Sequence, residues 1–190
     1  MFRWLTFILL LFWLLVYWQG GLKLCADFRS ALKSRVSRLD VFLLVFLAIL
    51  GLGMTLTAAW TVFTWTKPAA DSLLEGWGFI LTLTGVIGTF FSRAVLGKFW
   101  AAQTATQSDH VVVVAGPYSV VRHPIYSFAI LLYSGAGMVF PVWWNLLAAA
   151  GIVLGYALKA WEEERFLVRH LEGYAEYRRR VRWRLFPGLW

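Results

Sequence analysis

The 190-residue sequence has little cysteine and little acidic charge. Cys25 is the single cysteine, so the chain can form neither an internal disulfide nor a cysteine-based metal cluster. Ten Asp and Glu residues stand against 18 Lys and Arg residues, which gives a net charge of +8. No zinc-ligand spacing and no glycine-rich phosphate loop accompanies this charge, so the sequence argues against a nucleic-acid partner and against a metal site.

Charged residues make up only 15% of the chain, whereas hydrophobic residues make up 60%. Soluble domains carry about a quarter of charged residues, and the mean hydropathy of +0.66 also indicates a membrane protein. A helix that crosses a bilayer needs about 20 mostly apolar residues. The sequence predicts about five spanning helices, at residues 4–18, 41–65, 73–91, 125–140 and 142–160. The expected fold is all-α, with one membrane-embedded domain over residues 1–190.

The first and last apolar runs carry additional signals. A signal peptide is the alternative for the first run, because Arg3 precedes it. No small-residue cleavage site follows Trp18, so we expect a retained helix. Pro141 and Asn145 mark a tight turn between the last two runs, which are therefore expected to form a helical hairpin. Gly51, Gly53 and Gly85 are predicted helix-packing positions.

Positive charge gathers in the segments 19–40 and 92–124 and in the tail after residue 160, which holds seven arginines. Positively charged loops stay on the cytoplasmic side. We therefore predict that these three segments are cytoplasmic and that the N-terminus is outside. The composition fits a multi-pass protein of a prokaryotic inner membrane, and it gives no oligomeric state. The arginines at 178–184 are expected to anchor the tail to anionic lipid headgroups.

Two of the cytoplasmic stretches contain reactive side chains. In the first, a short extended valine segment at 111–114 leads to the turn Gly116-Pro117 and then to Pro124, which suits the first position of a helix. Arg122, His123 and Tyr126 are thus expected around a helix N-terminus, which favours an anionic group. In the second, three adjacent carboxylates, Glu162, Glu163 and Glu164, follow the fifth apolar run.

Four elements occur in order in the C-terminal half: Gly116-Pro117-Tyr118, Arg122-His123-Pro124-Ile125-Tyr126, Glu163-Glu164, and Tyr174, Tyr177 and Pro187. With this set, residues 90–190 resemble the isoprenylcysteine carboxyl methyltransferase family, and the related phospholipid methyltransferases share part of it. The resemblance implies a methyltransferase that uses S-adenosylmethionine. It also implies that residues 92–190 are the cofactor-binding half and that a cytoplasmic C-terminal helix closes the cofactor pocket. The apolar runs place three spanning helices in residues 1–91.

The resemblance further implies site residues. The implied cofactor contacts are Gln103, His110, Val111, Val112, Val113, Tyr118, His123, Pro124, Ile125, Tyr126 and Glu163. Arg122 and Lys159 are implied to orient the acceptor at the catalytic site. Lys159 stands where the family has an arginine, and it lacks the planar fork that holds a carboxylate with two bonds. The spacing to the tail leaves the choice between Glu162, Glu163 and Glu164 open.

The expected reaction is methylation of the carboxylate of an isoprenylcysteine-like or other lipidic acceptor. Such a carboxylate is ionised at neutral pH and needs no base. The alternatives are a phospholipid amine N-methyltransferase, whose acceptor must first lose a proton, a membrane reductase that uses NADPH and shares the Arg-His-Pro-x-Tyr element, and a non-catalytic membrane protein.

Overall fold

The computed structural model describes residues 1–31, 38–64, 71–99 and 111–190, and these residues form six α-helices and two short 3-10 helices. The elements are α1 (Phe2–Ala31), α2 (Arg38–Phe63), α3 (Ser72–Leu96), η1 (Gly97–Phe99), η2 (Gly116–Ser119), α4 (Pro124–Val139), α5 (Trp143–His170) and α6 (Tyr174–Arg180). The described residues contain no strand beyond one isolated bridge between Val121 and Trp183. The all-α prediction is therefore confirmed.

Three helices, α2, α3 and α5, are long and apolar enough to cross a membrane. The apolar part of α1, Phe2–Val16, and the whole of α4 are shorter. The 16 residues of α4 extend roughly 24 Å at the usual rise per residue, somewhat less than the hydrocarbon thickness of a bilayer. A span count of five stays a prediction.

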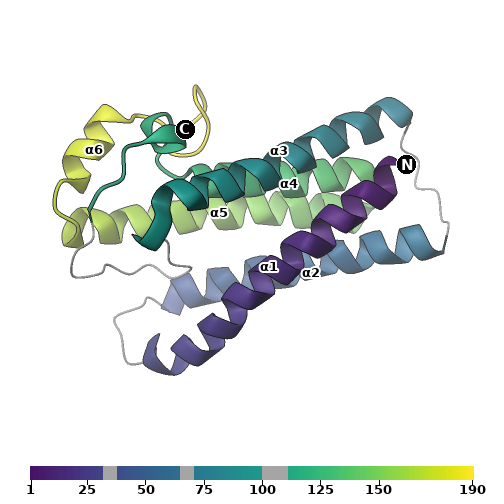
Figure 1. Cartoon of the computed structure of the whole chain (residues 1–190), viewed down its shortest axis with the longest axis horizontal. Helices are drawn as coiled ribbons and strands as arrows, with labels where there is room; N and C mark the ends of the chain where they lie inside the picture. Colours follow the sequence, from purple (N-terminus) through teal and green to yellow (C-terminus); the bar gives the residue numbers. More distant parts are fainter. Residues whose placement is uncertain (32–37, 65–70, 100–110) are drawn as a thin grey trace.

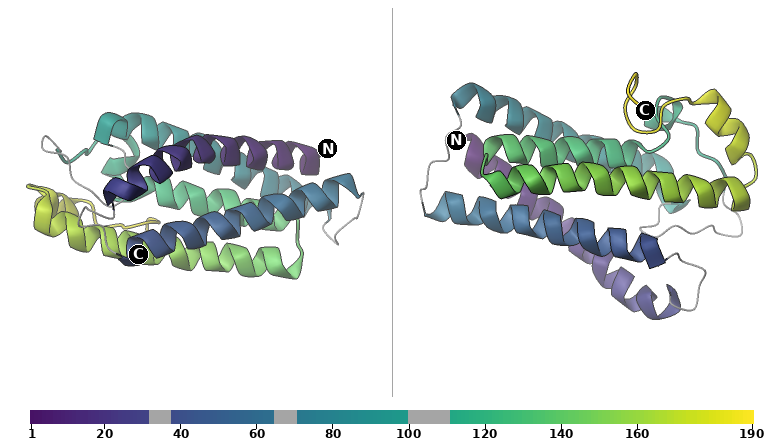
Figure 2. Two further views of the ribbon diagram at one scale, coloured as in Figure 1. Left: turned by 90° about the horizontal axis from the view of Figure 1, so that it is seen from below. Right: turned by 180° about the vertical axis from the view of Figure 1, so that it is seen from behind.

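The helices form one bundle in which α3 packs along α4 and α2 packs along α5 (Figures 1 and 2). α4 and α5 run antiparallel, and the expected hairpin is confirmed. Its turn is held by Asn145, whose Nδ2 donates to the carbonyl oxygen of Phe140 at 3.0 Å. Because α5 returns along α4, its C-terminal end lies beside the N-terminus of α4. α6 and the C-terminus lie at this end of the bundle, and the N-terminus lies at the other (Figure 1).

Two predicted boundaries differ from the structure. The segment from residue 19 was expected to be a loop, but α1 continues to Ala31. Each glycine of Gly20-Gly21 costs a helix about 1 kcal/mol, and the 30-residue helix continues through both. α5 likewise continues ten residues past position 160. This extension places all three adjacent carboxylates on a helix.

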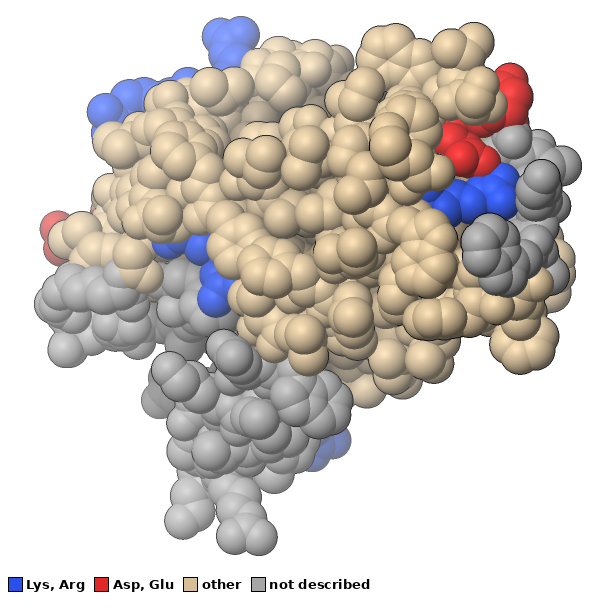
Figure 3. Space-filling view, turned by 45° about the vertical axis from the view of Figure 1, so that its right-hand side comes forward, with Lys and Arg blue, Asp and Glu red and all other residues tan. Residues whose placement is uncertain are grey.

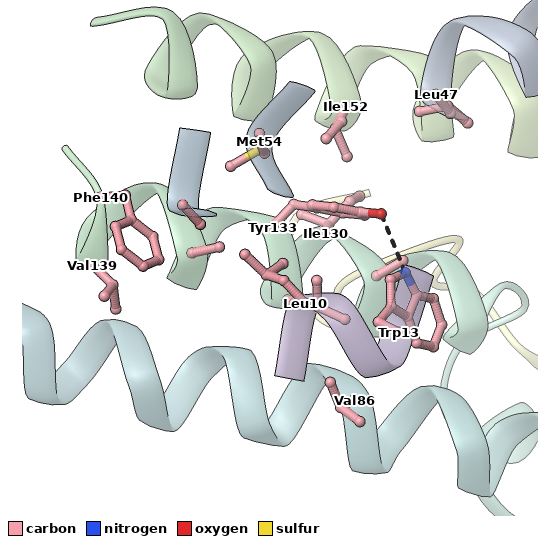
Figure 4. Packing of buried hydrophobic residues seen from close by; sticks show 14 of the residues in the cluster. Leu10, Trp13, Leu47, Met54, Val86, Ile130, Tyr133, Val139, Phe140 and Ile152 are labelled. Atoms are coloured by element: carbon pink, nitrogen blue, oxygen red, sulfur yellow. Dashed lines mark hydrogen bonds between the residues drawn. The ribbon is translucent and has the colours of Figure 1, made fainter. Parts of the chain in front are cut away.

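Apolar side chains fill the bundle and also cover its outside. Leu10, Trp13, Met54, Leu132 and Phe140 are buried together in the core, where Trp13 Nε1 donates to the Tyr133 hydroxyl at 3.2 Å (Figure 4). The face in Figure 3 shows a broad area without Lys, Arg, Asp or Glu. A bundle that is apolar both inside and outside is that of a membrane protein.

Candidate active site

The candidate site lies where the start of α4 meets the end of α5. Pro124 is the first residue of α4 and His123 is its N-cap residue, as the sequence predicts. The turn before it, η2, contains Pro117 and Tyr118. This arrangement brings His123 and Tyr126 opposite the carboxylates of α5.

Glu164 is the buried member of the three carboxylates, with 2% of its side chain exposed. Its Oε1 accepts from Arg122 Nε at 2.6 Å, and its Oε2 accepts from Arg184 Nη2 at 3.0 Å. His123 Nε2 lies 3.3 Å from Oε1, without hydrogen-bond geometry. Both carboxylate oxygens of Glu164 are thus engaged in ion pairs within the protein.

Glu163 points elsewhere and keeps a quarter of its side chain exposed. Its Oε2 accepts from the Tyr126 hydroxyl at 2.6 Å and lies 3.7 Å from His123 Nδ1. The ring of His123 stacks on that of Tyr126 with centroids 5.4 Å apart, and Tyr126 stacks on Tyr156 at 5.1 Å. Of the two carboxylates that face the start of α4, Glu163 is therefore the one that can reach a ligand.

The tail after α5 folds back onto the start of α4. Tyr174 and Tyr177 are buried with Leu167, Leu171 and Val181, and the Tyr177 hydroxyl donates to the carbonyl oxygen of Tyr118 at 2.8 Å. α6 thus lies where the sequence places a C-terminal helix.

Two buried hydroxyls in this region, those of Tyr118 and Tyr174, have no hydrogen-bond partner within the described part of the chain. Burial raises the pKa of the Tyr118 hydroxyl, and the negative charge of Glu163 raises it further. Burial likewise raises the pKa of Tyr174, with the charges of Glu164 and Glu163 adding to it. Both phenols therefore remain protonated and can offer a hydrogen bond to a ligand.

Of the remaining residues implied to contact the cofactor, the structure describes the valine segment and Ile125. Val111, Val112 and Val113 lie in an irregular segment, and Val112 packs against the tyrosine cluster of the tail. Within the described ranges, the backbone of this segment has no hydrogen-bond partner. Ile125 is half-buried in the first turn of α4. Gln103 and His110 lie outside the described residues.

The two residues implied to orient the acceptor are both engaged in buried ion pairs. Arg122 binds Glu164, as described above. Lys159, one turn before Glu163 on α5, pairs through Nζ with Asp40 Oδ1 at the start of α2. The side chains of Lys159 and Asp40 are 3% and 0% exposed.

Sequence reasoning missed Asp40, Glu164 and Arg184 as partners of these groups. Asp40 is a single charge at a helix edge, and nothing in its spacing connects it to α5. The expectation that the whole arginine run at 178–184 faces lipid is wrong for Arg184, whose side chain is 12% exposed and turned inward.

Comparison with known proteins identifies the family of this chain. The family model described as phospholipid methyltransferase matches residues 74–173, more than half of the chain. The chain belongs to the phospholipid methyltransferase family. The resemblance to membrane methyltransferases is thereby confirmed, and the matched segment begins within α3, earlier than the sequence motifs indicate. Membership of the phospholipid methyltransferase family supports a membrane methyltransferase.

A curated relative is the cobalt-zinc-cadmium resistance protein CzcN of Cupriavidus metallidurans. It is 32% identical over 123 residues, which cover 62% of this chain and 50% of the relative. The chain therefore spans about half the length of this relative. No group of three or more His, Cys, Asp or Glu side chains that could hold a metal ion occurs among the described residues.

Proposed function

We propose that the protein transfers a methyl group from S-adenosylmethionine to a lipidic acceptor at the membrane surface. The observation that carries this proposal is the partly exposed carboxylate of Glu163, held by Tyr126 beside the N-terminus of α4 in a chain of the phospholipid methyltransferase family. Exposed apolar side chains of α5, among them Leu158 and Trp161, lie within two turns of Glu163, so a lipid can approach the site from the side.

The residues present fit the chemistry of this cofactor. S-adenosylmethionine carries an ammonium group, a carboxylate and two ribose hydroxyls. Glu163 can accept from the ammonium or from the hydroxyls. Most N–H groups at the start of α4 are bonded within the protein: those of Arg122 and His123 donate to the tail, and those of Tyr126 and Ser127 donate to the carbonyl oxygen of His123. The buried hydroxyls of Tyr118 and Tyr174 provide two further donors, and both lack a partner within the described ranges. When bound, the cofactor supplies an electrophilic methyl group on a positively charged sulfur.

The ion pairs of Arg122 and Lys159 affect which class of acceptor the site can bind. A carboxylate acceptor, as in the isoprenylcysteine enzymes, needs a cation to orient it. Arg122 and Lys159 were expected in that role, but each is already paired with a buried carboxylate. Breaking a buried pair costs about 3–5 kcal/mol. This observation favours the second candidate acceptor, an amine headgroup of the phospholipid type.

An amine acceptor must lose a proton before or during transfer. Glu163 is the partly exposed carboxylate that faces the start of α4, and it can take that proton. Tyr118 is unsuited to the role, because burial and the nearby charge of Glu163 raise the pKa of its hydroxyl. The main work of the protein is to hold acceptor and methyl group in line at contact distance.

The first test is binding of S-adenosylmethionine to the detergent-purified protein by calorimetry. Glu163→Gln should weaken binding about 10- to 100-fold, because a hydrogen bond to a charged group contributes about 1.5–3 kcal/mol. Glu162→Gln is the matched control, since it makes the same change one residue away at a position with no described contact to the site. Equal affinities of Glu163→Gln and the wild type would remove Glu163 from the cofactor site. Binding of NADPH instead would assign the protein to the reductases.

The second test separates the acceptors. The protein is reconstituted with S-adenosylmethionine labelled in its methyl group, and the label is followed into phosphatidylethanolamine vesicles or into a prenylated cysteine acid. Label in the amine lipid alone supports the amine acceptor. Label in the prenylated acid alone would show that a buried cation is released for the acceptor.

A further inference from the structure

Five consecutive carbonyl oxygens of the tail, from Val181 to Leu185, accept hydrogen bonds from residues 122–127, which lie before and at the start of α4. The bonds are Arg122 Nη1 to Val181 at 2.7 Å and to Arg182 at 2.6 Å, Arg122 N to Trp183 at 3.0 Å, His123 N to Arg184 at 3.0 Å, and Ser127 Oγ to Leu185 at 2.5 Å. Almost all the donors come from two adjacent residues. Residues 181–185 of the tail are therefore docked through their backbone on the residues that carry the site.

The Glu164 carboxylate bonds both to the tail and to the residues on which the tail is docked. One carboxylate oxygen accepts from Arg122, which lies two residues before α4, and the other accepts from Arg184, which belongs to the tail. Both contacts are charge-assisted hydrogen bonds, the strongest class in proteins. Glu164 is 2% exposed, so water cannot replace it. A single buried carboxylate thus joins α5, α4 and the tail.

We propose that Glu164 is a positioning residue that clamps residues 181–185 onto residues 122–127. The clamp holds the His123 ring against Tyr126, and Tyr126 in turn holds the Glu163 carboxylate. Glu163 and Glu164 are adjacent but have different tasks: Glu163 contacts the ligand, and Glu164 orders the segments around it. This inference rests on the proposed function for the role of Glu163.

The first experiment measures the clamp without any cofactor. Hydrogen exchange is followed by mass spectrometry in peptides that contain Arg122 and His123, whose amides donate to the tail. Glu164→Gln should raise the exchange rate of these amides by tenfold or more, because a neutral amide cannot balance two buried guanidinium groups. Glu163→Gln is the matched control and should leave this exchange near the wild-type rate. Arg184→Gln removes only the tail half of the clamp and serves if Glu164→Gln does not fold.

The second experiment asks whether docking alone restores the site. Val121 and Trp183 form a backbone bridge, and paired backbone segments lie about 4.8 Å apart, within the range that a disulfide spans. Val121→Cys and Trp183→Cys are introduced together with Cys25→Ser and Glu164→Gln. Binding of S-adenosylmethionine should be at least tenfold weaker in the reduced protein and should recover most of that loss on oxidation. The same cross-link should restore no binding to Glu163→Gln.

The outcomes separate the clamp from the proposed function. Wild-type exchange rates in both Glu164→Gln and Arg184→Gln would overturn the clamp, and so would an oxidised cross-link that leaves binding as weak as in the reduced protein. A wild-type protein that binds no S-adenosylmethionine would overturn the proposed function. The exchange rates alone would then decide whether Glu164 holds the tail.

Discussion

Lys159 and Asp40 form a buried ion pair, and each compensates the charge of the other. Each side chain is almost fully buried, and the two lie on helices that are far apart in the sequence. An isolated charge in such surroundings is very costly, whereas a paired one is tolerated. The pair therefore ties the start of α2 to the last part of α5, next to the candidate site.

Removing one member of this pair should destabilise the protein more than removing both. Lys159→Met or Asp40→Leu alone leaves an uncompensated buried charge and should cost about 3–5 kcal/mol, whereas the double variant should cost much less. Thermal unfolding of the detergent-purified variants measures this difference. Additive losses in the double variant would contradict the pairing.

The same variants address the acceptor role implied for Lys159. If the double variant folds and still transfers methyl groups with the wild-type KM for the acceptor, Lys159 does not orient the acceptor. A KM raised tenfold or more, with an unchanged melting temperature, would support that role.

At the scale of elements, glycines determine how closely α3 and α4 approach. A Cβ atom on Gly85 would lie 2.5 Å from the backbone nitrogen of Leu132, and one on Gly78 would lie 2.7 Å from the carbonyl oxygen of Gly135. Thr82 bonds across the same contact, with its hydroxyl 3.3 Å from the carbonyl oxygen of Leu132. Small residues let helix backbones pack in this way in membranes.

Gly85→Ala should therefore destabilise the bundle by about 1–3 kcal/mol, the usual cost of overpacking. The prediction that Gly53 is a packing position is wrong, because a Cβ there meets nothing within 4 Å. Gly53→Ala is therefore the control, and alanine favours a helix by about 1 kcal/mol over glycine. The melting temperatures should fall for the first variant and stay level or rise for the second. A Gly85→Ala variant as stable as the wild type would show that α3 and α4 can separate at no cost.

At the scale of the whole molecule, the bundle has two different ends. At one end, Arg3 of α1 pairs with Glu75 of α3. At the other lie the candidate site, α6 and the C-terminus (Figure 1). The excess of basic residues after position 160 predicts that this second end faces the cytoplasm.

Labelling with a membrane-impermeant maleimide tests that orientation. Single cysteines replace the exposed residues Ser72 and Glu172 in a Cys25→Ser background. In intact cells, Ser72→Cys should react and Glu172→Cys should react only after lysis. Reaction of both in intact cells, or of Glu172→Cys alone, would reverse or abolish the predicted topology.

Much of this protein follows from local features of its sequence. The long apolar runs determine a membrane-embedded helical bundle, because backbone polar groups in lipid must be satisfied within helices. Pro141 and Asn145 determine the hairpin, and Pro124 determines where α4 begins. The motif around His123 and the Glu163-Glu164 pair indicate the family and the location of the site.

Only the tertiary structure decides which charged side chains form ion pairs with one another. Glu163 and Glu164 are neighbours in sequence, yet successive residues on a helix point in directions about 100° apart, so one faces Tyr126 and the other the two arginines. Arg184 looks like its exposed neighbours until the tail folds back. The partners of Arg122 and Lys159 come from 42 and 119 residues away. Pairing over such separations depends on how the helices pack, and local spacing in the sequence does not predict it.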